Sequence, residues 1–316
     1  MIKEETHEKE KNAARGKTIL FSGPSAVGKT AALRAVLPLL RAGGGRPCVC
    51  KIDCLQSADE ALYREIGVPC VTGLSGDLCP DHFLVSNLSE LWAWMQEQNG
   101  RERLVAAVDE PERNGQECPT AAGDGQERNG QECPAAANDE QGRNVQARPT
   151  AASDKQVWNG QERLAAAADE RPRAQNILVI ETAGLCHRCS PATERMTAGC
   201  VLDCTSSCRA PEQMGPMLTE ADFAVLTKID MVSQAELEIV SAAIRTCNPS
   251  IELFPLDGLS GYGADALAQW LLERPDGGGM EGDRLRHTMP SGVCSYCVGE
   301  TRVGAAFQQG VVGKIF

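Results

Sequence analysis

The chain has 316 residues, 42% of them hydrophobic, which is enough to bury one sizeable α/β core. A formal charge of −12 argues against a nucleic-acid partner, because binding to a phosphate backbone needs basic surface. The charged N-terminus is unlike a signal peptide, and no apolar run approaches the roughly 18 residues of a membrane span. We therefore expect a cytoplasmic protein without a membrane partner, whose 15 cysteines are metal ligands or packed side chains rather than disulfides.

The first element in the chain is a short apolar strand that leads into a glycine-bounded loop. Residues 17–22 are strand-like, GPSAVGKT follows, and a helical pattern, AALRAVLPLLRA, comes directly after it. Strand, loop and helix in this order are typical of a phosphate-binding loop, whose glycines let backbone N–H groups approach the phosphates. The lysine supplies a mobile charge and the threonine a hydroxyl ligand for Mg²⁺. The predicted nucleotide-binding residues are Gly23, Ser25, Ala26, Val27, Gly28, Lys29 and Thr30.

A repeat of fifteen residues occupies the middle of the chain. Variants of NGQER-x-AAA-D-E begin at Asn99, Asn114, Asn129, Asn144 and Asn159. The units contain almost no β-branched or aromatic side chains, so they cannot bury enough apolar surface to offset the chain entropy. We predict a disordered insertion over residues 99–175. A solenoid is the competing interpretation of a fixed period, and the lack of an apolar face disfavours it.

Cysteines follow the first strand after the repeat. Residues 176–180 have the composition of a buried strand and lead into ETAGLCHRCSP, which contains Cys186 and Cys189. Cys-x-x-Cys is a favoured spacing for soft metals, because a turn of that length lets both sulfurs reach one ion. Cys294 and Cys297 form a second such pair and would complete four thiolates for zinc or an iron–sulfur cluster. Whether the two pairs share one site stays open.

A further group of cysteines is spaced by four, at Cys200, Cys204 and Cys208. Residues 201–202 have strand character, which places Cys200 on a strand rather than on a helix with the other two. Only Cys204 and Cys208 are therefore expected to share the loop after that strand, and we predict them as a pair of metal ligands.

The segment after these cysteines indicates which nucleotide is bound. Residues 223–230 read as a strand that ends in TKID, where GTPases carry their base-recognition motif. The Asp230 carboxylate can accept hydrogen bonds from N1–H and the 2-amino group of guanine, whereas adenine offers no matching donors. Lys228 would lie along the base. A capped helix beginning at Ser233 and Glu236, a short strand over 251–254 and a loosely matching last GTPase loop follow.

The order of these motifs resembles the metallocentre-assembly GTPases, the HypB/UreG/CobW group of the SIMIBI class. GPSAVGKT, KID at 51–53, ETAG at 181–184 and TKID at 227–230 carry the resemblance, since that group uses a Glu-x-x-Gly box. The segment GVPCVTGLSGDLCPDH is similar to the hydrogenase and urease nickel-insertion branches. The urease branch has Cys-Pro-His as a metal site there, and this chain has one residue more between Cys79 and His82.

The resemblance implies the roles of several residues. Lys29, Asp53 and Glu181 would be catalytic, and Gly184 would bind the nucleotide. Cys79 and His82 would join the cysteines as ligands of nickel or zinc. It also implies a client metalloenzyme or another maturation protein as partner, and a homodimer for which the sequence supplies no interface.

The predicted fold class is an α/β P-loop NTPase with a mostly parallel central sheet flanked by helices. The sequence divides into a charged tail (1–15), a GTPase domain in two parts (16–98 and 176–274), the insertion between them (99–175), and a linker with a Cys-containing C-terminal segment (275–316). We expect a Mg²⁺-dependent GTPase that couples nucleotide state to delivery of a metal, nickel being favoured. The alternatives are a nucleotide-dependent iron–sulfur carrier or redox switch and, disfavoured by TKID, a small-molecule kinase.

Overall fold

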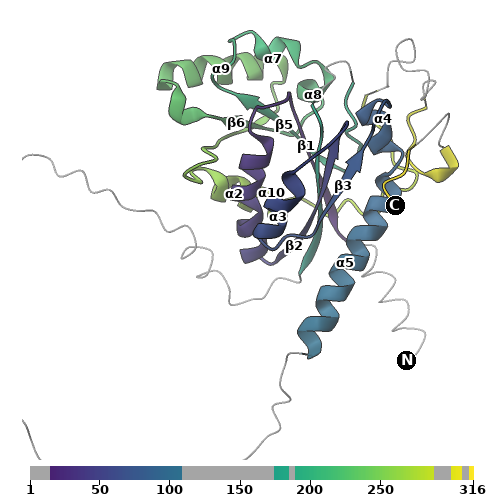
Figure 1. The fold of residues 1–316 in the computed structure, drawn as a ribbon. Helices are drawn as coiled ribbons and strands as arrows, with labels where there is room; N and C mark the ends of the chain where they lie inside the picture. The colour runs from purple at the N-terminus through teal and green to yellow at the C-terminus, as the bar shows by residue number, and fades with distance from the viewer. Residues whose placement is uncertain (1–14, 109–173, 185–188, 288–299, 308–312) are drawn as a thin grey trace, which may run out of the picture.

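The computed structural model describes residues 15–108, 174–184, 189–287, 300–307 and 313–316. In these ranges the chain forms one seven-stranded sheet with helices on both faces (Figure 1). All six pairs of neighbouring strands are parallel. The predicted α/β class with a parallel central sheet is thereby confirmed.

The strands follow the order β3-β2-β4-β1-β5-β6-β7 across the sheet. Parallel strands end at the same edge, so the loops after β1, β2, β4, β5, β6 and β7 meet there. In open α/β sheets ligands bind at this edge, where the strand order reverses. The strands are β1 (Lys17–Ser22), β2 (Gly45–Asp53), β3 (Cys70–Leu74), β4 (Gln175–Glu181), β5 (Thr197–Asp203), β6 (Phe223–Thr227) and β7 (Glu252–Pro255).

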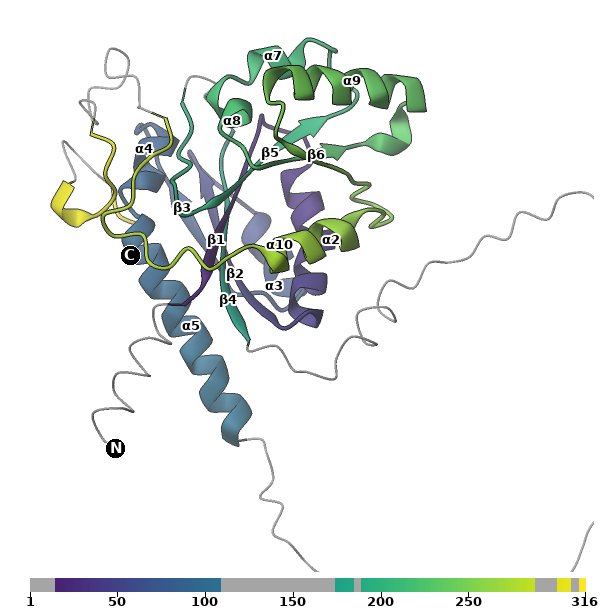
Figure 2. The same ribbon diagram turned by 180° about the vertical axis from the view of Figure 1, so that it is seen from behind.

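The helices divide between the two faces of the sheet (Figures 1 and 2). One face is covered by α2, α3 and α10, whose apolar side chains form one core. On the other face, α4 and α5 pack over β2 and β4, while α8 and α9 pack over β5 and β6. The bounds are α2 (Lys29–Ala42), α3 (Asp59–Glu65), α4 (Pro80–Val85), α5 (Leu88–Val108), α7 (Ala210–Gln213), α8 (Pro216–Thr219), η1 (Ile229–Met231), α9 (Gln234–Cys247), α10 (Ala264–Glu273) and η2 (Ala305–Phe307).

Alternating side chains of the central strand supply both cores. Ile19 and Phe21 of β1 pack beneath α2, and Leu20 between them packs on the opposite face. Such a strand reads as a continuous apolar run because both of its faces are buried. The sequence-predicted cap of α9 is also confirmed: the Ser233 hydroxyl accepts from the Glu236 backbone N–H, and the Glu236 carboxylate accepts in return.

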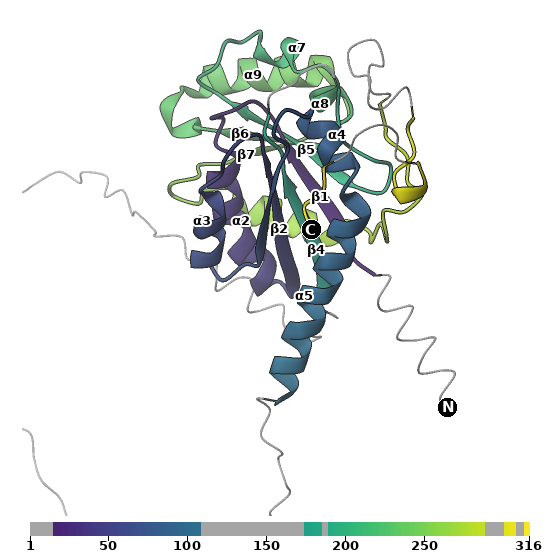
Figure 3. The ribbon, with the colours of Figure 1, turned by 45° about the vertical axis from the view of Figure 1, so that its right-hand side comes forward.

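Helix α5 extends into the range for which the sequence predicts an insertion. The helix continues to Val108, ten residues beyond the predicted boundary, and it runs past the end of the sheet in Figure 3. Asn99, the first residue of the repeat, is buried and donates a hydrogen bond to the Arg46 carbonyl at 3.4 Å. Contact with β2 therefore holds Asn99 in place, which composition alone could not indicate. Residues 109–173 lie outside the described ranges.

The segment that the sequence predicts as a linker packs on the domain. Met280 and Val303 are buried with α5 in the second core, and Leu285 pairs with Thr193 in an antiparallel bridge. The Asn87 side chain exchanges hydrogen bonds with the backbone of residues 313 and 315. A Cβ atom on Gly277 would lie 2.1 Å from the Arg195 carbonyl oxygen, so this glycine allows the segment to approach the domain closely. None of the described helices is both long and apolar enough to cross a membrane.

Candidate functional site

The phosphate-binding loop connects the central strand β1 to α2. Backbone angles in the left-handed region occur at Gly23 (φ 139°), Ala26 (φ 62°) and Gly28 (φ 91°). Left-handed residues alternating with ordinary ones turn successive N–H groups toward one point, which makes an anion-binding concavity. The N-terminus of α2, beginning at Lys29, adds its dipole to the same place. The loop predicted to bind phosphates thus has the backbone geometry for that task.

Lys29 lies folded back over this loop. Its Nζ atom donates to the carbonyl oxygens of Gly23 (2.8 Å) and Pro24 (2.7 Å). Burial lowers the pKa of Lys29 to about 8, against the opposing effect of the nearby Glu181 carboxylate. The positive charge is therefore held by weak neutral acceptors in a poorly solvated place, and phosphate oxygens would be better partners.

Glu181, the last residue of β4, lies at the centre of a buried hydrogen-bond network. Its Oε1 atom accepts from Lys51 Nζ (2.7 Å) and from the Thr30 hydroxyl (2.8 Å). Its Oε2 atom accepts from the Tyr63 hydroxyl. Burial, with the Glu181 charge adding to it, raises the pKa of Tyr63, so the phenol stays a donor. Both oxygens of the carboxylate are thus fixed in position.

The residues around Thr30 suit a magnesium ion. The Thr30 hydroxyl lies 2.8 Å from Glu181 Oε1 and 3.2 Å from Asp59 Oδ2, so three oxygen atoms converge. Hard oxygen ligands of this kind, completed by water and phosphate oxygens, are what Mg²⁺ prefers. Asp53 is half-buried and ends β2 at the same edge of the sheet. Its charge acts to raise the pKa of Lys29, more weakly than Glu181 does. The donor set fits Mg²⁺ at the residue for which the sequence predicts it.

Gly184 brings the ETAG box against the phosphate-binding loop. It has φ +73°, and a Cβ atom there would lie 2.0 Å from the Gly23 carbonyl oxygen and 2.9 Å from Lys29 Nζ. The Ser25 hydroxyl donates to the Ala183 carbonyl at 3.3 Å. The two predicted motifs, separated by about 150 residues of sequence, are therefore in direct contact.

The TKID segment also contacts the phosphate-binding loop. The Thr227 hydroxyl donates to the Val27 carbonyl at 2.6 Å, which fixes the end of β6 beside the loop. Lys228, in a left-handed conformation, forms an ion pair with Asp203 at the end of β5. That ion pair lies on the wall of a pocket of about 210 Å³ that the phosphate-binding loop also lines. Asp230 follows in η1 and is exposed.

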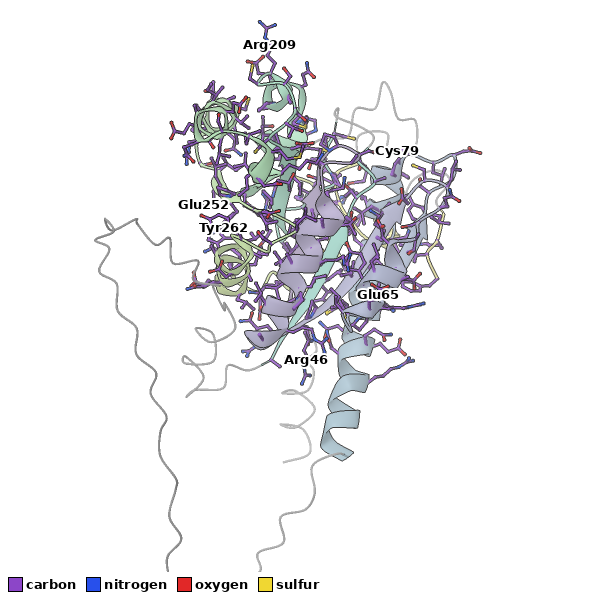
Figure 4. All side chains as sticks on the ribbon, turned by 60° about the vertical axis from the view of Figure 1, so that its left-hand side comes forward. Arg46, Glu65, Cys79, Arg209, Glu252 and Tyr262 are labelled. Atoms are coloured by element: carbon purple, nitrogen blue, oxygen red, sulfur yellow. The ribbon has the colours of Figure 1, made fainter. Side chains whose placement is uncertain are left out.

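The last loop of the sheet lies over the start of α2. A Cβ atom on Gly258 would lie 3.0 Å from the Ala31 side chain. Asp257 accepts hydrogen bonds from the backbone N–H groups of Leu259 and Ser260, which fixes the turn. Leu259 and Tyr262 extend from this loop as exposed apolar side chains, Tyr262 being labelled in Figure 4. The loop thus reaches the N-terminal end of α2, beside the phosphate-binding residues.

A second group of predicted residues gathers at α4. Cys79 caps this helix, and Figure 4 shows it at the opposite end of the sheet from Arg46, which lies near the start of β2. The Cys189 thiol donates to Asp81 Oδ2 at 3.1 Å, so the loop after the ETAG box reaches the CPDH segment. Burial raises the pKa of Asp81 to about 7, partly offset by that hydrogen bond. His82 is buried on the first turn of α4.

The structure brings these side chains near one another without assembling a ligand set. Among the described residues, no three His, Cys, Asp or Glu side chains are arranged to hold a metal ion. The reason at α4 is that His82 is turned into the core, while Cys79 stays at the cap. Cys186, Cys294 and Cys297 lie outside the described residues.

The predicted pair Cys204 and Cys208 differs in its environment. Cys204 directly follows β5 and is buried, and burial raises its pKa to about 11. Cys208 is exposed. Cys204 and Cys208 both line one pocket beside α9, and their role as metal ligands stays a prediction.

Sequence reasoning missed three residues of the network around Glu181: Lys51, Asp59 and Tyr63. The sequence did indicate Lys51, because a lysine inside an otherwise buried strand is uncommon without a charged partner. No pattern in the sequence indicated Asp59 and Tyr63, since only the packing of α3 against α2 and β2 brings them to the site.

The chain is 31% identical over 299 residues to the uncharacterized protein MJ0120 of Methanocaldococcus jannaschii, covering 95% of this chain and 96% of that protein. No protein-family profile matches the sequence. The similar solved structures include two at 14% identity. HypB from Helicobacter pylori in complex with nickel has a TM-score of 0.46, covering 85% of this chain and 91% of that one. Hydrogenase maturation factor HypB from Archaeoglobus fulgidus has a TM-score of 0.45, covering 84% and 92%.

Proposed function

The chain belongs to the family of the uncharacterized protein MJ0120 of Methanocaldococcus jannaschii, and we propose that it is a Mg²⁺-dependent GTPase that couples its nucleotide state to the delivery of a metal ion into a client enzyme. Nickel is the metal that we favour. The observation that carries the nucleotide part is the contact of three loops at one edge of the sheet. Gly184 and Thr227 both lie against the loop that contains Lys29.

The geometry supports binding of a nucleoside triphosphate. The backbone N–H groups of residues 23–30 would bind the β- and γ-phosphates, and Lys29 would leave its two carbonyl partners for phosphate oxygens. Thr30 would hold Mg²⁺, which neutralises phosphate charge and orients the γ-phosphate. Guanine would lie between Lys228 and the loop over α2, with Asp230 accepting from its two donors.

Hydrolysis needs a positioned water and stabilised phosphate charge. Lys29 would supply the charge at the phosphates. The Tyr63 hydroxyl holds Oε2 of Glu181, so this carboxylate would hold Mg²⁺ or an attacking water in a defined orientation. Asp53, at the end of β2, would act on the same shell of water. Because Gly184 contacts the loop, departure of the γ-phosphate would be sensed by the segment that follows it.

That segment is what would connect the nucleotide to the metal. Cys189 lies five residues beyond Gly184 and contacts Asp81 of the CPDH segment. Cys186, Cys189 and Cys79 are the proposed ligands of the transported metal, and His82 would join them only after it leaves the core. Thr193 and Leu285 form a bridge, and these two residues lie near Cys189 and Cys294 in the sequence. This bridge supports a contribution from Cys294 and Cys297 to the same metal site.

The experiment that tests the nucleotide assignment is the Asp230→Asn substitution. Each hydrogen bond from guanine to a carboxylate contributes about 1.5–3 kcal/mol, so GTP affinity should fall at least about tenfold. ATP affinity should not change, because adenine has no donors for this carboxylate. Calorimetric titration of both nucleotides measures the two effects.

The matched control is Glu238→Gln, which removes one carboxylate charge from the exposed face of α9. It should leave both affinities unchanged. Wild-type protein that binds ATP as tightly as GTP would disprove the guanine assignment, whatever the variant does.

A further inference from the structure

Lys51 is a charged side chain in the interior of the sheet. It lies on β2 with Cys50 and Ile52 as buried neighbours, and its own side chain is only 8% exposed. In the parallel register of β2 and β4 it stands opposite Glu181. A lysine in such a place is retained only with a charged partner, since burying an unpaired ammonium is costly.

Two carboxylates hold the Lys51 ammonium. Nζ lies 2.7 Å from Glu181 Oε1 and 3.0 Å from Asp59 Oδ2. Burial lowers the pKa of Lys51, but the Glu181 and Asp59 carboxylates raise it by more, so the net shift is upward and the side chain stays charged. One cation therefore sits between two anions at a poorly solvated place, where their attraction is strong.

The same two oxygen atoms are those that Thr30 contacts. Its hydroxyl lies 2.8 Å from Glu181 Oε1 and 3.2 Å from Asp59 Oδ2. Lys51 and the Mg²⁺-binding threonine thus share a pair of acceptors. A divalent cation bound by Thr30 would need those oxygens, directly or through its water shell, and Mg²⁺ tolerates little departure from octahedral geometry.

We propose that the Lys51 ammonium is a built-in counter-cation, which neutralises Glu181 and Asp59 in the nucleotide-free protein and is displaced from them when Mg²⁺ arrives with the nucleotide. This role rests on the proposed Mg²⁺–nucleotide site, and it would make Mg²⁺ binding at that site depend on the nucleotide. Lys51 makes the carboxylates poor ligands for free Mg²⁺, so the ion binds only when phosphates add their own negative charge.

The test is titration of Mg²⁺ alone, without nucleotide, into wild-type protein and two variants. Lys51→Gln removes the charge and keeps a hydrogen-bond donor, and Lys51→Arg keeps the charge. We expect Lys51→Gln to bind Mg²⁺ at least tenfold more tightly than the wild type. We expect Lys51→Arg to stay at the wild-type affinity.

Thermal unfolding supplies a second readout that does not depend on activity. Lys51→Gln leaves the buried Glu181 carboxylate and the partly exposed Asp59 carboxylate without their counter-cation, so its midpoint should be below that of the wild type, and Mg²⁺ should restore it. The wild-type midpoint should not respond to Mg²⁺. If Lys51→Gln is too unstable to purify, Mg²⁺ in the lysis buffer should recover folded protein, and failure of that recovery counts against the proposal.

Equal Mg²⁺ affinity in wild type and Lys51→Gln would overturn the counter-cation role. Weaker binding of Mg²⁺–nucleotide by Lys51→Gln with unchanged Mg²⁺ affinity would also overturn it, because Lys51 would then act on the phosphates. The proposed function is tested separately by wild-type protein, which must bind Mg²⁺–GTP in the same buffer. If it does not, the nucleotide site itself is refuted.

Discussion

The Gly184→Ala variant is expected to lose about 100-fold or more in kcat/KM for nucleotide hydrolysis. The added Cβ atom would lie 2.0 Å from the Gly23 carbonyl oxygen, far inside any allowed contact. Either the ETAG box or the phosphate-binding loop must move, and displacement of about 1 Å at a reacting centre costs this much in rate. Steady-state phosphate release measures the loss.

The control separates the clash from backbone strain. Gly282 has φ +72°, almost the same as the +73° of Gly184, but nothing lies within 4 Å of its Cβ position. Gly282→Ala therefore imposes the same left-handed conformation, at about 1–2 kcal/mol of stability, without touching the loop. Its hydrolysis rate should equal that of the wild type. Equal rates for Gly184→Ala and wild type would contradict the proposed contact of the two motifs.

The Lys29→Ala variant is expected to lower kcat by about 10²–10³-fold, as removal of one strong charge-stabilising group does in other enzymes. The fold should survive, because Lys29 contributes only two hydrogen bonds, to the backbone carbonyls of Gly23 and Pro24. Circular dichroism and thermal unfolding check the fold, and phosphate release checks the rate.

Arg34→Ala is the matched variant for charge removal on α2. Arg34 lies five residues further along the helix, and its half-exposed side chain is 3.8 Å from Glu65. Exposed pairs of this kind contribute little to stability, so both rate and midpoint should stay close to wild type. A Lys29→Ala protein that hydrolyses nucleotide at the wild-type rate would refute the phosphate-binding loop.

The sheet could be predicted from the sequence because each motif stands at the end of an apolar run. Strands such as β1 and β4 are buried on both faces, so their composition identifies them without knowledge of their neighbours. The packing of residues 275–287 could not be predicted. Met280 is an isolated apolar residue among glycines, and only contact with α5 reveals its place.

The parts of the candidate site that lie on one continuous segment could be predicted from the sequence. The parts that depend on packing between distant segments could not. A phosphate-binding loop is one continuous segment, so Lys29 and Thr30 could be placed from their spacing. The network of Glu181 joins residues from β2, β4, α2 and α3, which only the fold brings together. Cysteine spacing likewise says nothing about burial, and Cys204 turned out to be enclosed.

The central claim is that metal affinity depends on the bound nucleotide. The most direct measurement is calorimetric titration of Ni²⁺ into the protein loaded with GDP and, separately, with a non-hydrolysable GTP analogue. Coupling between two sites is typically 1–3 kcal/mol, so the two affinities should differ by about five- to 150-fold. Cys186→Ala/Cys189→Ala should lose this difference and keep GTP binding, whereas Cys247→Ala, which removes a thiol from α9, should keep both. Equal Ni²⁺ affinities of the wild-type protein in the two nucleotide states would contradict the account.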